Sequence, residues 1–392
     1  MSSKVNSSQN YDVIVVGARA AGAATAMLLA RRGLEVLALD RGRYGTDTLS
    51  TNALMRAGVL QLHRWGLLDK IREAGTPPVR AAEFHYGEDT LRVPIKPADG
   101  VDALFAPRRS VLDRILVDAA QAAGVEVRFG VSVDELQRAG DRRVVGIVGR
   151  DQKGHPISPR AAFTVGADGV NSRVARDVHA EVTREGEDTG AVVFGYFKNT
   201  GVDDAYVWAY QEGASAGFIP TNDEAVCVFT GSHQVRFKQE IQRDIAAGFY
   251  KILGEAAPGF VDRIQEKNQV EHFRGFPGII GYYRRPWGDG WALVGDAGYF
   301  KDPITAHGIS DALRDAELLA RALTEALEHP AREKQALAQY EQIRDEVSHD
   351  LFQVTEQVAA YAWTLDDLKA HLSNLSKAMA PEVELIKTFG PV

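Results

Sequence analysis

Two glycines and one aspartate near the start of the sequence have the types and the order needed to hold a nucleotide. Gly17 and Gly22 enclose the stretch GARAAG, and Asp40 ends the next apolar run. Glycine permits a sharp turn out of a strand and a close approach of the following helix. The free N–H groups and the positive dipole end of that helix would face a pyrophosphate. The carboxylate would accept hydrogen bonds from both ribose hydroxyls and would repel a 2′-phosphate.

The surrounding pattern predicts the strand, helix and strand that must position these residues. A β-branched run at 13–16 predicts a buried parallel strand, residues 20–32 predict a helix, and 34–39 predict a second strand. Arg19 replaces the middle glycine of the usual G-x-G-x-x-G pattern, so its side chain has to turn aside. Near the phosphates it would add a cation. An ordinary strand–helix–strand unit without a nucleotide is the alternative.

Two further turns occur later in the sequence, each at the end of an apolar run. The first is Gly-Ala-Asp-Gly at 166–169, and the second is formed by Gly295 and Asp296. A Pro-Ile-Thr-Ala-His-Gly stretch at 303–308 then precedes a long amphipathic helix. Its His307 either works as an acid or base near a bound ring or holds the start of that helix.

An arginine stands at the start of one more predicted helix. Leu112, Ile115 and Leu116 have helical spacing, and Arg109 lies just before them. A guanidinium there can pair with a phosphate, and a solvated arginine at a helix end is the alternative.

The composition is that of a globular chain and excludes several classes of function. The 392 residues carry a net charge of −8 and the pI is about 5.7, so no nucleic-acid surface is expected. Cys227 is the single cysteine, which excludes an internal disulfide and any multi-cysteine metal site and is typical of a cytoplasmic protein. No apolar run is long enough to span a membrane, and the polar residues 1–10 lack the apolar segment of a signal peptide.

The three motifs, in this order, resemble the FAD-dependent monooxygenases of the para-hydroxybenzoate hydroxylase type. The same superfamily contains flavin-dependent halogenases and geranylgeranyl reductases, and the resemblance covers nearly the whole chain. It implies an α/β fold in which a Rossmann-like FAD-binding domain carries a β-sheet substrate domain and a helical C-terminal region. The expected boundaries are 1–78, 105–189 and 286–330 for the FAD-binding domain, 79–104 and 190–285 for the substrate domain, and 331–392 for the C-terminal region.

The resemblance also implies the cofactor and the residues that hold it. FAD is expected as the cofactor and NAD(P)H as the reductant, with reduced flavin from a partner flavin reductase as the other source. Pro303, His307 and Gly308 are expected beside the reactive part of the flavin, and no metal ion is expected. The residues expected to bind FAD are Gly17, Arg19, Ala20, Ala21, Gly22, Asp40, Arg41, Arg109, Val131, Asp168, Gly295, Asp296, Thr305 and Ala306.

The implied reaction is monooxygenation. One oxygen atom of O₂ would enter an aromatic, polyketide-like or other electron-rich small molecule through a C4a-hydroperoxide of the flavin, and the aromatic-rich stretch 190–230 suits such a pocket. Halogenation is disfavoured, because the stretch 213–220 lacks both tryptophans of the halogenase pattern Gly-Trp-x-Trp-x-Ile-Pro and no lysine lies between Ile71 and Ile95. A reductase of isoprenoid-type double bonds and a flavin-binding protein without catalysis remain as alternatives.

Overall fold

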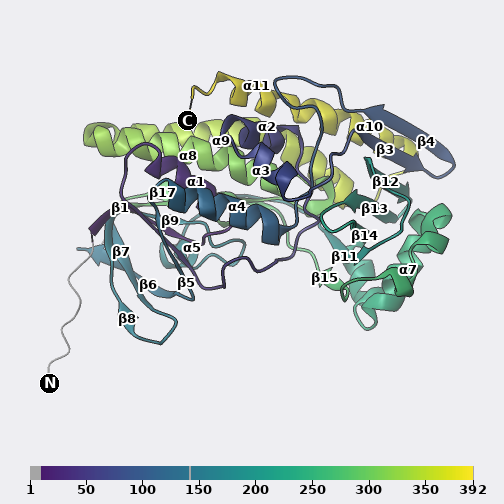
Figure 1. Cartoon of the computed structure of the whole chain (residues 1–392), viewed down its shortest axis with the longest axis horizontal. Coiled ribbons are helices and arrows are strands. Elements are labelled where there is room, and N and C mark those ends of the chain that lie inside the picture. The colour runs from purple at the N-terminus through teal and green to yellow at the C-terminus, as the bar shows by residue number, and fades with distance from the viewer. Residues whose placement is uncertain (1–9, 141–142, 392) are drawn as a thin grey trace.

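The computed structural model describes residues 10–140 and 143–391, so nearly all of the predicted polar lead-in lies outside the described residues. Figure 1 shows two sheets at opposite ends of the molecule. The long helices α8 (Gly308–Glu328) and α9 (Glu333–Ala359) run along one side between them and pack against each other. These helices therefore connect the two halves of the molecule.

The first sheet is built on the predicted parallel strands. β1 (Asn10–Val16) pairs with β2 (Val36–Asp40) on one side and with β9 (Arg160–Gly166) on the other. The β-branched core of β1 is fully buried, as expected of a strand covered on both faces. The sheet is completed by β5 (Glu126–Phe129), β6 (Ser132–Ala139), β7 (Arg143–Arg150), β8 (Pro156–Ile157), β17 (Trp287–Gly288) and β18 (Trp291–Leu293).

Because β1, β2, β9 and β18 are parallel, the turns that follow them meet at one edge of this sheet. α1 (Ala20–Ala30) starts at that edge and packs against α8 and α4 (Arg109–Ala122). Shorter helices in the same half are α2 (Arg56–Arg64), α3 (Leu68–Glu73) and α5 (Arg173–Asp177). A small antiparallel sheet joins β10 (Val182–Glu185), β16 (Tyr282–Arg284) and β19 (Tyr299–Phe300).

The second sheet combines strands from two distant parts of the sequence. In spatial order its strands are β15 (Arg274–Phe276), β11 (Gly190–Phe197), β14 (Val226–His233), β13 (Ala214–Pro220), β12 (Ala205–Gln211), β3 (Ala81–Tyr86) and β4 (Asp89–Pro94). β3 pairs parallel with β12, so the early hairpin forms the far edge of a sheet whose other strands come much later. α7 (Ile245–Ala256) covers one face, and the other face joins the core of the first half.

The chain ends in α10 (Leu365–Ala378) and α11 (Ala380–Thr388), which pack on α9 and α2 respectively. The predicted α/β class with a helical C-terminal region is confirmed. The division into domains at the expected boundaries stays a prediction. Among the residues that the structure describes, no helix is long and apolar enough to cross a membrane.

Candidate functional site

The turn after β1 requires glycine at both predicted positions. Gly17 has a φ of +102°, and a Cβ there would lie 2.3 Å from the carbonyl oxygen of Ala167. A Cβ on Gly22 would lie 1.8 Å from the carbonyl oxygen of Gly17. Only hydrogen fits at these two points, so α1 can begin directly against the end of β1.

The carboxylate of Asp40 is fixed at the end of β2. It accepts hydrogen bonds from the backbone N–H groups of Ala18, at 2.9 Å, and Gly42, at 2.6 Å. These contacts leave lone pairs for a ribose. Val131 lies directly behind, where its N–H donates to the Asp40 carbonyl, and Arg41 is exposed beside it.

Arg19 turns aside, as its place in the motif requires. Its guanidinium lies 3.4 Å from the carboxylate of Asp113 and also contacts Thr46. Ala20 and Ala21 open α1, which has neither a side-chain cap nor an acidic residue in its first turn. The N–H groups at this helix start therefore stay available to a phosphate, which is the chemistry that an FAD pyrophosphate needs. Contact between Arg19 and the phosphates stays a prediction.

The two arginines at the start of α4 have different partners. Arg109 donates to the buried Asp113 at 3.0 Å, and burial raises the pKa of that carboxyl group. Arg108, which was not among the predicted site residues, is also buried and pairs with Asp47 and Glu271. Because these partners come from separate loops, no local spacing could have indicated Arg108.

In the turn at 166–169, the Asp168 carboxylate forms hydrogen bonds within the protein. It accepts from the Ser172 hydroxyl and from the Arg173 N–H, each at 2.6 Å, and so holds the start of α5. Support of a pyrophosphate by Asp168 stays a prediction.

The Gly295–Asp296 elbow reaches the same edge of the sheet. A Cβ on Gly295 would lie 2.8 Å from the Cβ of Ala21, so this turn rests on the start of α1. Asp296 is open to solvent, yet desolvation by the surrounding protein raises its pKa to about 6, against the opposing effect of Arg109 and Lys301. An accessible carboxylate at this edge suits hydrogen bonds from the hydroxyls of a bound cofactor.

The start of α8 is shaped by the preceding loop. The buried Asp302 carboxylate accepts from the N–H groups of Ile304, at 2.9 Å, and Gly190, at 2.7 Å, so it ties the loop to β11. Pro303 follows, Ala306 has a φ of +50°, and Gly308 is exposed at the first position of the helix. α8 has no side-chain cap, which leaves its N–H groups free for an electron-rich ring edge.

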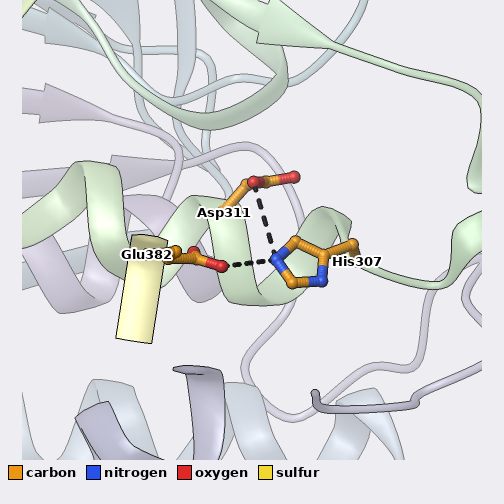
Figure 2. A group of neighbouring side chains, drawn as sticks. All are labelled: His307, Asp311 and Glu382. Atoms are coloured by element: carbon orange, nitrogen blue, oxygen red, sulfur yellow. Dashed lines mark hydrogen bonds and ion pairs between the residues drawn. The ribbon is translucent and has the colours of Figure 1, made fainter. Parts of the chain in front are cut away.

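His307 does not face solvent. Its side chain is 0% exposed, and its Nε2 lies 2.6 Å from Glu382 of α11 and 4.0 Å from Asp311 (Figure 2). The contact with Glu382 ties the start of α8 to α11. The assignment of His307 as a catalytic residue stays a prediction. Thr305 is buried beside it and contacts Thr355 at 3.3 Å.

A buried charge cluster surrounds this histidine, and no sequence pattern indicated it. Lys301 pairs with Asp311, and Arg314 donates to Asp311 at 2.9 Å and to Glu382 at 3.3 Å. Arg314 also binds Asp315 at 2.8 Å. We define the charge cluster as Lys301, His307, Asp311, Arg314, Asp315 and Glu382.

The turns at this edge of the sheet supply the features of a flavin dinucleotide site, and the family comparison agrees. The chain belongs to the FAD binding domain family, whose model matches residues 10–355. Its cofactor is therefore FAD, and it is a flavin-dependent oxidoreductase by family.

Its relatives carry more than one activity. It is 27% identical to digeranylgeranylglycerophospholipid reductase 1 of Methanopyrus kandleri, over 97% of both chains. It is 24% identical to tryptophan 2-halogenase of Chondromyces crocatus, over 79% of this chain and 60% of that one. The flavin-dependent brominase Bmp2 shares the fold with a TM-score of 0.77 at 21% identity, over 97% of this chain and 98% of that one. PqsL of Pseudomonas aeruginosa, described as a probable FAD-dependent monooxygenase, has a TM-score of 0.72 at 21% identity, over 96% of this chain and all of that one.

Proposed function

We propose that this flavoprotein reduces a carbon–carbon double bond of a largely apolar, isoprenoid-type substrate. The similarity to the Methanopyrus kandleri reductase extends over nearly the whole of both chains, and further reductases of the same name match over most of their length. This reaction therefore takes precedence over the monooxygenation that the sequence motifs alone favoured. The electron donor, NAD(P)H or a partner flavin reductase, is part of the proposal.

The observation that carries the proposal is the face of the second sheet that packs against the first half. Strand pairing places Phe194 opposite Phe229, Phe229 opposite Gly217, and Gly217 opposite Trp208, in one row across four strands. The side chains of this row are buried in the common core. The buried side chains that these four strands contribute to this face carry no charge, so the face suits a substrate whose reacting part is apolar.

A polar group borders this face at one end. The Tyr196 hydroxyl accepts from the Asn52 side chain at 2.8 Å, and the Arg108 guanidinium lies 3.7 Å from the centre of the Tyr196 ring. Arg108 is held in turn by Asp47 and Glu271. This arrangement would orient a polar end of the substrate while the rest lies along the apolar row. FAD, once bound and reduced by the electron donor, would supply hydride to the double bond, and a proton from solvent would complete the reduction. The protein orients the double bond and excludes bulk water.

The test uses the holoenzyme, photoreduced without oxygen and mixed with geranylgeranyl diphosphate. We expect the absorbance of oxidised flavin to return, and the product to gain the mass of two hydrogens per reduced bond. Trp208→Leu should weaken this reaction. Phe218→Leu, on the opposite face of the neighbouring strand, controls for a loss of sheet stability. A flavin that stays reduced until oxygen is admitted would contradict the proposal.

Monooxygenation of an aromatic compound is the second candidate, favoured by the rings of Phe194, Trp208 and Phe229 on the same face. It predicts that one atom of isotopically labelled O₂ appears in a phenolic product, with no incorporation of bromide or chloride. Monooxygenation would be the correct assignment if the labelled oxygen appears in the product and the isoprenoid is not reduced in the absence of oxygen.

A further inference from the structure

The charge cluster lies directly behind the start of α8, where the flavin ring is proposed to sit. It contains three carboxylates, from Asp311, Asp315 and Glu382, and two basic side chains besides His307, from Lys301 and Arg314. Only Arg314 is a permanent cation, because burial lowers the pKa of Lys301 to about 7. Even with Lys301 protonated, the ionised carboxylates outnumber the cations of the cluster by one while His307 is neutral. Arg344 of α9 also acts on Asp315, but it is itself paired with Asp345. All six side chains of the cluster are buried, so the excess negative charge is poorly screened.

The two nitrogens of His307 are in different situations. Nε2 lies 2.6 Å from the Glu382 carboxylate, and an ionised carboxylate only accepts hydrogen bonds, so Nε2 carries a proton. Nδ1 has no hydrogen-bond partner within the part of the chain that the structure describes. Figure 2 shows that it faces away from both Asp311 and Glu382. The Glu382 contact thus holds the ring in the tautomer that leaves a basic lone pair on Nδ1.

The charges around the His307–Glu382 pair also favour a neutral ring with a free Nδ1 lone pair. Burial alone raises the pKa of Glu382, but the hydrogen bond from the Nε2–H of His307 and the charge of Arg314 outweigh it and hold that pKa well below its usual value. Burial lowers the pKa of His307, against the opposing effect of Glu382. The ring is therefore neutral at neutral pH and able to accept a proton when further negative charge arrives nearby.

We propose that His307 takes up one proton at Nδ1 when the bound flavin is reduced. Two electrons and one proton reach the flavin from a nicotinamide nucleotide as hydride, and one further proton comes from solvent to Nδ1. Nε2 keeps its proton and Glu382 keeps its charge. The new imidazolium cancels the negative charge of the cluster and offsets the charge that reduction adds at the start of α8. His307 and Glu382 are positioning residues in this scheme, because neither has to touch a substrate.

The test measures the protons taken up per electron pair, from the pH dependence of the flavin midpoint potential. The absorption spectrum of reduced flavin shows separately whether the ring itself is an anion. In the unmodified holoenzyme we expect uptake of two protons together with the spectrum of the anion, which places one proton on the protein. Uptake of one proton, or the spectrum of neutral reduced flavin, would overturn the proposal without any variant.

Variants then locate the proton. His307→Gln keeps a donor toward Glu382 but removes Nδ1, so uptake should fall to one proton. Glu382→Gln weakens the basicity of the ring and should move the uptake to lower pH. Glu384→Gln removes the same charge from the same helix, but from an exposed residue paired with Lys387, and should change nothing. Unchanged uptake in His307→Gln with FAD retained would overturn the assignment.

His307, Asp311 and Glu382 also lie close enough together to be considered as metal ligands. Both carboxylates are already paired with Lys301 or Arg314, which opposes a further cation. One Zn²⁺ bound per chain at micromolar concentration, and lost in His307→Gln, would assign the group to a metal and overturn the proposal.

Discussion

Two regions beside the expected cofactor site are built in opposite ways. One is the sheet edge that follows β1 and β2, and the other is the region behind the start of α8. At the first, backbone groups and missing side chains make room, as the close contacts of Gly17 and Gly22 show. At the second, buried charged side chains from several segments compensate one another. The first region depends on space, whereas the second depends on charge balance. Changes of volume should damage the first region most, and changes of charge the second.

The largest effect is expected from Arg314→Met. The side chain of Arg314 is fully buried among Asp311, Asp315 and Glu382, and its loss leaves these carboxylates without their shared cation. We expect a loss of about 3–5 kcal/mol in the free energy of unfolding, measured with urea. Arg321→Met, on the same helix but part-exposed, should cost about 1 kcal/mol or less. If both variants lost the same free energy of unfolding, the stability of the second region would not depend on its buried charges.

Gly22→Val is the corresponding change of volume. The new Cβ would overlap the Gly17 carbonyl, so α1 must move away from β1 and from the pyrophosphate. We expect most of the FAD to be lost and the free energy of unfolding to fall by about 1–3 kcal/mol. Flavin absorbance and thermal unfolding measure the two effects. Gly254→Val is the control, since a Cβ there meets open space. Full FAD occupancy in Gly22→Val would mean that the turn is not the pyrophosphate site.

Asp296→Asn tests a single charge in the first region through the pH dependence of folding stability. The folded-state pKa of Asp296 is raised to about 6 by desolvation, so the folded form binds this proton more tightly than the unfolded form. Raising the pH through 6 therefore costs the unmodified protein stability that the asparagine variant keeps. After removal of the flavin, we expect Asp296→Asn to be stabilised relative to the parent above pH 6, with the advantage fading as the pH falls toward 4. An advantage that does not change with pH would contradict this assignment.

The smallest effect is expected at the rim of the first region. Arg19 is 35% exposed and its contact with Asp113 is long, so Arg19→Ala should weaken FAD binding only several-fold. The loss should grow at low salt, because screening weakens an exposed cation. Arg31→Ala, at the other end of α1, is the matched control. A loss that does not depend on salt would place Arg19 away from the phosphates.

The same contrast explains how much the sequence could predict. The strands and glycine turns around Gly17, Asp40 and Asp296 follow from short patterns whose causes are local, and they were predictable together with the α/β class. Glu382 lies 75 positions from His307, and no spacing rule links two such residues. Arg108 depends in the same way on Asp47 and Glu271, which come from distant loops. The motifs could not decide the reaction either, because hydroxylases, halogenases and geranylgeranyl reductases share this family.

The early hairpin of β3 and β4 has a consequence for how the chain folds as it is synthesised. The two strands leave the ribosome long before β12, the strand on which β3 must pair. A lone two-stranded hairpin is marginally stable in water, and β4 is exposed along its whole length, with Leu91 and Val93 among the exposed apolar side chains. Closing this sheet requires contacts of high sequence separation, which are slow to form. Until β12 is synthesised, the β12-facing edge of β3 therefore stays unpaired. We expect the second sheet to be the last part of the molecule to become ordered and the part most dependent on a chaperone.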